Sequence, residues 1–461
     1  MPSRSGARHP AGTNPSSPVS GGTRAADSSL ETRFHRTLSQ VGALEQDQQL
    51  LVAFSGGLDS RVLLQLAAAV HTHTDFRLRA MHVHHGLSAN ADAWADFCRD
   101  TCATLGVPLD IVHVSVDKTS RLGIEAAARA ARYRVLLGTG ADWVLLAHHE
   151  DDQAETLLLQ MLRGAGAKGL SAMAAVDPGR RLLRPLLDVS RAELAHYAKT
   201  HDLCWVEDES NADTAYDRNY CRHEILPVMA RRFPAARATL ARSARHLAEA
   251  AQLLDALAVM DATGAVEAGR LSISALAALD APRARNLLRW WLSASEQAAP
   301  STAALQEMLR QLVEARTDAS VQLVLGDMRV CRYRGFAYLE PNTVSLPLAM
   351  TWQREAELSL PDGSRLVFER QCGGGLAVVR LDVDKLQIRN RQGGERFQPD
   401  CRRPSRTLKH LLQEAAMPPW LRARLPLLYC GDKLAAVPAI GIACELQASE
   451  DEEGVEVYWQ P

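Results

Sequence analysis

The sequence predicts an α/β fold in which a parallel-sheet domain is followed by a helical domain and by a small mixed α/β domain at the C-terminus. Four short apolar runs are typical of buried strands: 50–54, 76–83, 109–116 and 143–147. Helical patterns separate these runs, at 59–70, 91–105 and 124–138. Alternating strands and helices favour a parallel sheet covered on both faces, with its ligand site at the carboxyl ends of the strands.

The later segments have different patterns. Residues 186–200 predict a helix, with Ser190 as its N-cap and Glu193 completing a capping box. Ala, Leu and Arg recur with helical periodicity from 229 to 315, which predicts a second, helical domain. Positions 341–375 carry Pro and Gly with short alternating runs and fit a linker or a small β unit. The remainder mixes strands with one or two helices.

The bulk properties bound the class of protein. A chain of 461 residues, 23% charged and 47% hydrophobic, is long enough for two or three soluble globular domains. The formal net charge of -2 excludes a uniformly basic nucleic-acid-binding protein, so any such surface must be a local patch. No apolar run reaches membrane-spanning length, so no membrane partner is expected. The first 30 residues are rich in Ser, Gly, Pro and Arg, lack the apolar core of a secretory signal and predict a disordered tail.

Nine cysteines are scattered along the chain, and none forms a CxxC pair. Their spacing argues against a disulfide framework, a zinc ribbon and a simple iron–sulfur site. Reduced thiols in a cytoplasmic protein are the expectation that follows.

The sharpest motif lies between the first strand and the first helix, and it reads Ser55-Gly56-Gly57-Leu58-Asp59-Ser60. The glycines let backbone N–H groups approach an anion closely, and the helix directs its positive end at the same point. Ser55 and Ser60 add hydroxyl donors. The loop has no Lys, so it is not a Walker P-loop, and Asp59 is expected to hold Mg²⁺ that bridges phosphates. The alternative is a glycine-rich turn in which Asp59 and Ser60 only cap the helix.

A second cluster follows the other strands. Three histidines lie at the end of the second strand, at 82, 84 and 85, and His148 and His149 end the fourth. Asp152 and Glu155 share one face of the helix that follows. These groups can bind a cation, orient an amine and carry protons; helix capping by the acids is the alternative. Zinc is disfavoured because neighbouring histidines on a strand point to opposite faces.

Two arginines, Arg129 and Arg132, share a face of the predicted helix 124–138. Arginine near ATP can neutralise phosphate charge in the transition state. A solvated face with a Glu125–Arg129 ion pair explains the same pattern, and the sequence does not decide between the two.

The hexapeptide resembles the loop of the PP-loop ATP-pyrophosphatase superfamily, whose members cleave ATP between the α and β phosphates. Further segments resemble the tRNA(Ile)-lysidine synthase family: Met161 to Gly164, Arg184-Pro185-Leu186, 207–227, Ser405 to Glu414, and Pro418 to Asp432. The resemblance covers most of 50–227 and 387–445. His84 departs from the family, where Asn is more frequent, and an insert surrounds Cys401.

Two basic groups are candidates for binding RNA. Arg218 and Arg222 are four residues apart and could straddle a phosphate, with Tyr216 available for stacking. The segment 389–409 contains seven basic residues and only two acidic ones. This local excess predicts either a phosphate-binding patch or a solvated basic face. The candidates in this patch are Arg402, Arg403, Arg406 and Lys409.

The resemblance implies an AMP-forming carbon–nitrogen ligase that uses ATP and Mg²⁺ and acts on the isoleucine tRNA with a CAU anticodon. The C2 oxygen of the wobble cytidine, position 34, is adenylated, and free L-lysine then displaces AMP to form lysidine, so that AUA is read in place of AUG. Asp59, Arg129, His148, Asp152 and Glu155 are the expected catalytic residues. A homodimer is compatible with the sequence.

Two other functions remain open at this point. A PP-loop tRNA thiolase would need catalytic or cluster-binding cysteines, for which only Cys98 and Cys102 are near. A non-catalytic tRNA-binding protein could retain the nucleotide loop as a relic. The predicted divisions are a disordered tail at 1–45, a PP-loop ATP-pyrophosphatase catalytic domain at 46–227, a helical tRNA- or substrate-binding domain at 228–340, a linker or small β unit at 341–384, and a C-terminal tRNA-binding domain at 385–461.

Overall fold

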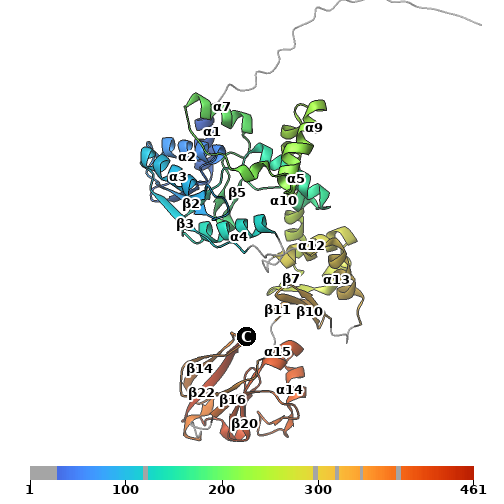
Figure 1. Cartoon of the computed structure of the whole chain (residues 1–461). Helices are drawn as coiled ribbons and strands as arrows, with labels where there is room; N and C mark the ends of the chain where they lie inside the picture. Colours follow the sequence, from blue (N-terminus) through green and yellow to red (C-terminus); the bar gives the residue numbers. More distant parts are fainter. Residues whose placement is uncertain (1–28, 118–122, 294–299, 317–320, 343–345, 381–385) are drawn as a thin grey trace, which may run out of the picture. The chain divides into compact units, whose positions relative to one another are not determined.

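The computed structural model describes residues 29–117, 123–293, 300–316, 321–342, 346–380 and 386–461. The chain forms two compact units, Met1–Leu253 and Leu254–Pro461, which are described separately (Figure 1). Among the described residues, no helix combines the length and the apolarity that crossing a bilayer requires.

A six-stranded sheet organises the first unit, in the order β3-β2-β1-β4-β6-β5. Its strands are β1 Gln49–Ala53, β2 Arg77–His84, β3 Leu109–His113, β4 Trp143–Leu145, β5 Val176–Asp177 and β6 Leu182–Leu183. All neighbouring pairs are parallel except β5 with β6. The chain runs from β1 outward to β3 and then returns to β4 on the other side of β1. The topological switch point, where open α/β sheets bind ligands, therefore lies between β1 and β4.

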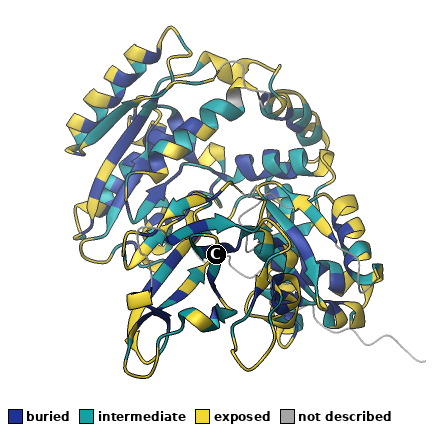
Figure 2. Ribbon diagram, turned by 90° about the horizontal axis from the view of Figure 1, so that it is seen from below, coloured by how far each residue is buried: buried dark blue, intermediate teal, exposed yellow. Residues whose placement is uncertain are grey.

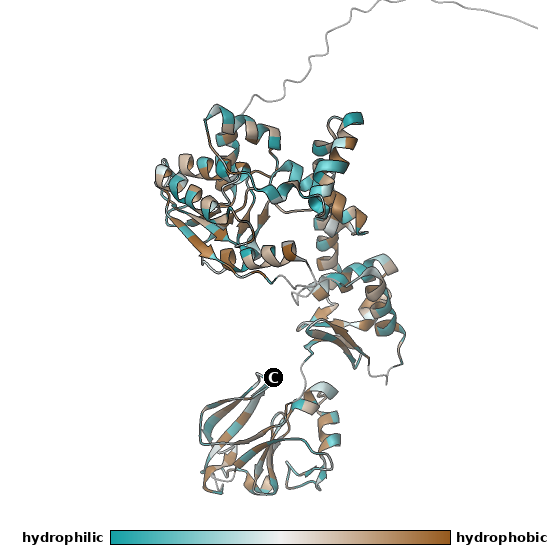
Figure 3. Ribbon diagram, in the orientation of Figure 1, coloured by the Kyte–Doolittle hydropathy of each residue, from teal (hydrophilic) through white to brown (hydrophobic). Residues whose placement is uncertain are grey.

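Helices cover both faces of this sheet, as the parallel pairing requires. The covering helices are α1 Leu30–Gln40, α2 Leu58–His71, α3 Ala91–Leu105 and α7 Arg191–Thr200 on one face and α4 Ile124–Leu137 on the other. The unit also contains α5 Glu150–Leu162, α6 Ala167–Leu170, α8 Asp217–Tyr220, α9 Leu226–Arg232 and most of α10 Ala236–Ala262. Side chains alternate along β1: Leu50 and Val52 join the core under α1, α2, α3 and α7, whereas Leu51 joins the core under α4. The strands are mostly hydrophobic in Figure 3, and Figure 2 shows helices that bury one side only.

The predicted strands and helices of this half are confirmed within a few residues. The capping box of α7 is also confirmed: the Ser190 hydroxyl accepts from the Glu193 backbone N–H at 3.2 Å, and the Glu193 carboxylate accepts from the Ser190 backbone N–H at 2.8 Å.

The expected disordered tail was set too long. Residues 1–28 lie outside the described part of the chain, but 30–40 form the helix α1. Phe34 and Leu38 are fully buried in the main core, and the Arg33 guanidinium donates to Glu193 at 2.9 Å. The sequence did not predict this helix because the polar, Ser-rich segment before Leu30 is typical of a disordered tail. The helix is stabilised mainly by packing of its apolar face on the core and not by local helix propensity.

The second unit opens with a domain that is not purely helical, contrary to the prediction for 228–340. Three helices, α11 Ile273–Ala278, α12 Ala281–Ser293 and α13 Thr302–Glu314, pack on a five-stranded antiparallel sheet. Its strands are β7 Val266–Glu267, β8 Arg270–Ser272, β9 Gln322–Leu325, β10 Met328–Tyr333 and β11 Phe336–Pro341. The strands are two to six residues long, too short for a clear alternating pattern in the sequence.

The expected linker at 341–384 belongs to the C-terminal domain. Its strands are β12 Ala349–Thr351, β13 Glu357–Ser359, β14 Arg365–Cys372 and β15 Leu376–Ala377. The remaining elements are β16 Leu386–Asn390, β17 Arg396–Phe397, β18 Arg406–Thr407, α14 Leu408–Glu414, α15 Pro419–Arg424, β19 Pro426–Cys430, β20 Lys433–Val437, β21 Gly441–Ile442 and β22 Glu453–Gln460. The strand β14 pairs along its whole length with β22 near the end of the chain, and β12 pairs with β16. Because these partners are distant in sequence, the segment alone looked like a connection.

The expectation that all thiols are reduced is wrong for one pair. Cys401 and Cys444 form a disulfide, with their Cα atoms 5.3 Å apart. The fold brings the insert after β17 against the turn after β21, where the Cys444 N–H donates to the Gln398 carbonyl at 2.9 Å. A separation of 43 residues gives no hint of this contact in the sequence.

Candidate active site

The glycine loop lies directly after β1 and is braced by its own serines. The Ser60 hydroxyl donates to the Gly57 carbonyl at 3.0 Å and accepts from the Ser55 N–H at 3.2 Å. Its oxygen also lies 3.0 Å from the Ser55 hydroxyl. Ser60 is buried and braces the loop, whereas Ser55 is exposed.

Gly56 is required by both conformation and space. Its φ of 86° lies in the left-handed region that favours glycine. A Cβ at this position would come within 2.9 Å of Val206 and 3.2 Å of the Cys98 sulfur. The Val206 N–H donates to the Gly56 carbonyl at 3.0 Å, so the segment after α7 packs on the back of the loop. The loop's N–H groups are thereby presented at the start of α2, as anion binding needs.

Asp59, in the first turn of α2, faces a histidine from the neighbouring strand end. One carboxylate oxygen lies 3.5 Å from Nε2 of His149, and the other is buried without a hydrogen-bond partner in the described structure. His149 is 1% exposed, and its Nε2 is also 3.5 Å from a carboxylate oxygen of Asp152. Burial lowers the pKa of His149, but the bond to Asp59 and the charges of Asp152 and Asp59 outweigh it, so the pKa is raised.

Asp152 and Glu155 lie on one face of α5, as predicted, and bind two arginines. Arg218 donates to Glu155 at 2.8 Å and to Asp152 at 2.7 Å. Arg222 donates to the two Glu155 oxygens at 2.6 and 3.0 Å. Burial acts to raise the pKa of Asp152, but the charges of His149 and Arg218 prevail and lower it to about 2. Two carboxylates and two guanidiniums thus form a compact cluster without net charge.

This cluster changes the expectation for Arg218 and Arg222. Their side chains are 22% and 27% exposed, and their guanidiniums bind acids. Arg222 stands in a π-helical turn, Cys221–Ile225, between α8 and α9. Such turns occur frequently at functional sites. RNA contact by these two arginines remains a prediction, and it would need one of them to leave an acid.

Both histidines after β4 take part in the site. The strand ends at Leu145, so the rule of alternating faces does not apply to His148 and His149. Burial is the main cause that lowers the pKa of His148 to about 3. The Asp152 carboxylate acts to raise this pKa, whereas the charges of Arg184, Arg218 and Arg129 lower it further. His148 is therefore neutral at ordinary pH and can donate or accept a hydrogen bond. The sequence placed His149 in the same cluster as His148 but not among the expected catalytic residues, because its contact with Asp59 is created only by the fold.

Buried polar atoms without a partner gather at this edge of the sheet. Within the described residues, six of the ten such side-chain atoms follow strands β1, β2, β4 and β6 or lie on α4: those of Asp59, His85, Arg132, His148, His149 and Arg184. Native proteins leave few buried polar groups unsatisfied. Their concentration here indicates a site that a polar ligand completes.

Arg129 lies in the same region. Its guanidinium stacks on Tyr133 at 5.1 Å and donates to the Tyr133 hydroxyl at 3.3 Å. Its charge acts on His148 and on Arg132, whose pKa is lowered mainly by burial. The Glu125 side chain, and with it the alternative Glu125–Arg129 ion pair, lies outside the described residues.

The histidines of β2 serve different purposes. His82 is buried, with Nδ1 3.0 Å from the Phe54 carbonyl and 3.4 Å from the Cys98 sulfur. His84 lies 3.0 Å from Asp92.

Two cysteines lie in the core near this site. Burial raises the pKa of Cys98 to about 12 and that of Cys102 to about 11, so both are thiols held in the core. In the described residues no three His, Cys, Asp or Glu side chains converge as metal ligands.

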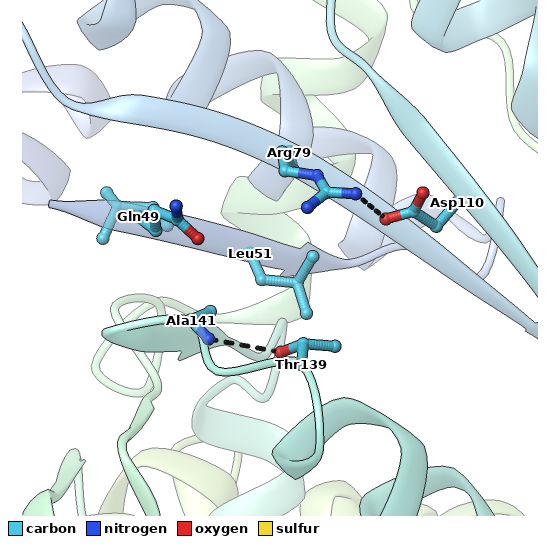
Figure 4. A pocket seen from close by; sticks show the side chains of 7 residues that line it. Gln49, Leu51, Arg79, Asp110, Thr139 and Ala141 are labelled. Carbon is cyan, nitrogen blue, oxygen red and sulfur yellow. Dashed lines mark hydrogen bonds and ion pairs between the residues drawn. The ribbon is translucent and has the colours of Figure 1, made fainter. Parts of the chain in front are cut away.

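A small pocket of about 200 Å³ lies at the other end of the sheet (Figure 4). Gln49 and Arg79 stand at the amino ends of β1 and β2, and Arg79 pairs with Asp110 at 2.6 Å. The pocket is therefore separate from the site at the carboxyl ends.

The predicted C-terminal patch lies in the second unit and is partly neutralised. Arg406 makes a two-pronged ion pair with Glu414 at 2.6 and 2.7 Å, and Arg403 lies 3.4 Å from Asp400. Arg402 and Lys409 are exposed, and among the described residues neither has an ion pair. These two side chains are the best placed to meet an external anion.

Comparison with known proteins assigns the family. A PP-loop domain model matches residues 27–229, a TilS substrate binding domain model matches 271–338, and a TilS substrate C-terminal domain model matches 386–459. The chain is 45% identical to a tRNA(Ile)-lysidine synthase of Nitrosomonas europaea, over 93% of this chain and 94% of that one. The chain belongs to the tRNA(Ile)-lysidine synthase family. Relatives of the same name from Azoarcus sp. and Coxiella burnetii are 43% and 39% identical, each over 92% of this chain and 94% and 96% of theirs.

Membership of the tRNA(Ile)-lysidine synthase family confirms the predicted resemblance and sets the two alternative functions aside. The buried thiols Cys98 and Cys102 agree with this outcome. A solved U34-tRNA thiolase from Methanococcus maripaludis has a TM-score of 0.42 and 18% identity, covering 48% of this chain and 78% of that one. Likeness at that level does not discriminate between activities.

Proposed function

We propose that this chain joins the ε-amine of free lysine to C2 of the wobble cytidine in the isoleucine tRNA with a CAU anticodon, at the carboxyl edge of the sheet in its first unit. In the first step the C2 oxygen attacks the α-phosphorus of ATP, and pyrophosphate leaves. In the second step the neutral amine attacks C2, AMP leaves with the former C2 oxygen, and the amine loses a proton. The unpartnered polar atoms that gather at this edge of the sheet, including one of Asp59 in the glycine loop, support this assignment most directly.

The loop and its neighbours suit the first step. The N–H groups at the start of α2 and the Ser55 hydroxyl would hold the phosphates, and His148, as a neutral imidazole, would donate a hydrogen bond to the α-phosphate. Arg129 would offset charge that develops there. Asp59 has an unpartnered carboxylate oxygen and fits Mg²⁺, which typically binds one or two carboxylates together with phosphates. When bound, Mg²⁺ would offset the charge of the departing pyrophosphate.

The acid–arginine cluster suits recognition of lysine, with one condition. Lysine has an ordinary pKa near ~10.4, so its ammonium must lose a proton before attack. Asp152 and Glu155 can bind the ammonium only if Arg218 or Arg222 gives up a hydrogen bond, because the cluster as it stands has no net charge. Lysine therefore exchanges with a guanidinium in this proposal, and the released arginine becomes available to a tRNA phosphate.

The proposed reaction is tested by mass spectrometry of the tRNA after incubation with ATP and isotopically labelled lysine. The wobble nucleoside should gain the mass of lysine less one water, with the label retained. Unchanged tRNA, or incorporation of label at another nucleotide, would contradict the assignment. Omitting either ATP or tRNA is the matched control, and neither mixture should yield labelled nucleoside.

The C-terminal patch gives a separate prediction. Replacing Lys409 by Ala should weaken tRNA binding and reduce the slope of log affinity against log salt by about 0.7–0.9, since one phosphate contact is lost. Arg406→Ala should change the slope less, because Arg406 is already paired with Glu414. Filter binding at several salt concentrations measures both. Lys433→Ala is the control and should leave the salt slope unchanged, since that exposed lysine pairs with Glu445 at 3.2 Å. If the salt slope of Lys409→Ala equals that of the unmodified chain, the patch does not bind tRNA phosphates.

A further inference from the structure

The segment after the π-helical turn carries a charge pattern that the proposed reaction does not use. From Ile225 to Ala248 the chain contains five arginines and no Asp or Glu. These arginines lie on α9 and the first turns of α10, at positions 231, 232, 237, 242 and 245. In a protein of net charge -2, a run of this length with one sign is a distinct local surface.

One of these arginines joins the surface to the candidate active site. Arg237 forms an ion pair with Asp151 at 2.9 Å. Asp151 is the neighbour of Asp152 in the first turn of α5. The other four are not in ion pairs among the described residues, and Arg231, Arg232, Arg242 and Arg245 are all exposed.

Exposed aromatic rings accompany the arginines. Phe233, directly after α9, is 62% exposed, and the Arg232 guanidinium lies 5.7 Å from the centre of its ring. Tyr220, at the end of α8, is 51% exposed. Exposed rings beside cationic side chains are the features with which proteins bind single-stranded nucleic acid: bases stack on the rings, and cations follow the backbone.

The position of this surface relates it to the reacting nucleotide. Arg222 binds Glu155 in the π-helical turn, and the chain continues as a helix from there to Arg232. Ten residues at 1.5 Å each span roughly 15 Å. A base beside the target could therefore reach Phe233 while the target nucleotide occupies the site.

We propose that α9 and the start of α10 form a docking surface for the single-stranded nucleotides next to the reacting base. Phe233 stacks on one of these bases, and Arg231 and Arg232 hold phosphates. This inference rests on the proposed function and names the part of the first unit that receives the RNA loop. The alternative is structural: both arginines lie in the last turn of α9, where they would stabilise the helix end without touching RNA.

The test uses the full chain and an RNA hairpin with a CAU anticodon loop, with binding followed by fluorescence anisotropy. Phe233→Ala should weaken binding roughly 5- to 140-fold, the range for loss of one stacked base, and Phe233→Tyr should restore it. Arg231→Gln with Arg232→Gln should lower the salt slope by about 1.4, at about 0.7 for each single-strand phosphate contact. A fully paired RNA of equal length should bind all variants alike.

Matched charge loss elsewhere is the control. Arg36→Gln with Arg79→Gln removes the same charge from α1 and β2 and should leave the salt slope unchanged. Hairpin affinity and slope that stay at the unmodified values in both Phe233→Ala and the double arginine variant would overturn the docking surface, as would an equal loss for paired RNA. If the unmodified chain forms lysidine while these variants bind normally, only this surface is wrong. If the unmodified chain forms no lysidine, the proposed function itself fails.

Discussion

Replacing Asp59 by Ala should abolish turnover while tRNA binding stays near its normal affinity. Asp59 offers an unpartnered carboxylate oxygen at the start of α2 and is the residue proposed to hold Mg²⁺ beside the phosphates. Loss of several kcal/mol of charge stabilisation corresponds to a fall on the order of 10³-fold in rate. Steady-state release of pyrophosphate measures the rate, and filter binding measures affinity for tRNA.

The control for Asp59 is Asp110→Asn. Asp110 is also a carboxylate of the parallel sheet, but it pairs with Arg79 at the amino ends of the strands (Figure 4). This variant should retain its activity within about twofold, since the pair is solvent-exposed. A normal rate of tRNA modification by Asp59→Ala would show that the metal role is wrong.

Replacing Glu155 by Ala should both inactivate and destabilise the first unit. Glu155 is 1% exposed and accepts three of the five hydrogen bonds that bind Arg218 and Arg222 to the acids of α5. Its loss leaves two guanidiniums with one acid. Breaking a buried ion pair costs about 3–5 kcal/mol, and the lower end applies because both arginines keep about a quarter of their exposure. Urea unfolding measures the free energy, and lysidine formation measures activity.

A surface acid is the comparison for Glu155. Asp47 pairs with Arg77 at 2.8 Å, and both side chains are more than half exposed. Asp47→Asn keeps a residue that tolerates the left-handed φ of 68° there and should change the free energy of unfolding by less than about 1 kcal/mol. Equal stability of the Glu155 and Asp47 variants would contradict the structural role of the cluster.

Local patterns allowed the sheet, the glycine loop and the acidic face of α5 in the first unit to be predicted from sequence. Strands β1 and β4 are largely apolar runs because most of their residues are buried, and the loop at Ser55 to Ser60 has Gly56 where conformation and space require a glycine. The face shared by Asp152 and Glu155 follows from helical spacing alone. Such features depend on neighbours in the chain, so the sequence contains the information directly.

Features that depend on distant partners were not predictable. Arg218 and Arg222 looked like free cations, because the acids that bind them lie more than sixty residues earlier. The strand β14 looked like a linker because its partner β22 lies at the chain end. The disulfide and the docking of α1 likewise depend on contacts that only the folded chain creates.

The bond of ATP that breaks is the most direct test of how this edge of the sheet works. The complete chain is supplied with tRNA, lysine and ATP labelled separately at the α and the γ phosphate, and the products are separated by chromatography. The geometry of the loop predicts that α label appears in AMP and γ label in pyrophosphate, in equal amounts with lysidine. Label in ADP and inorganic phosphate would contradict it.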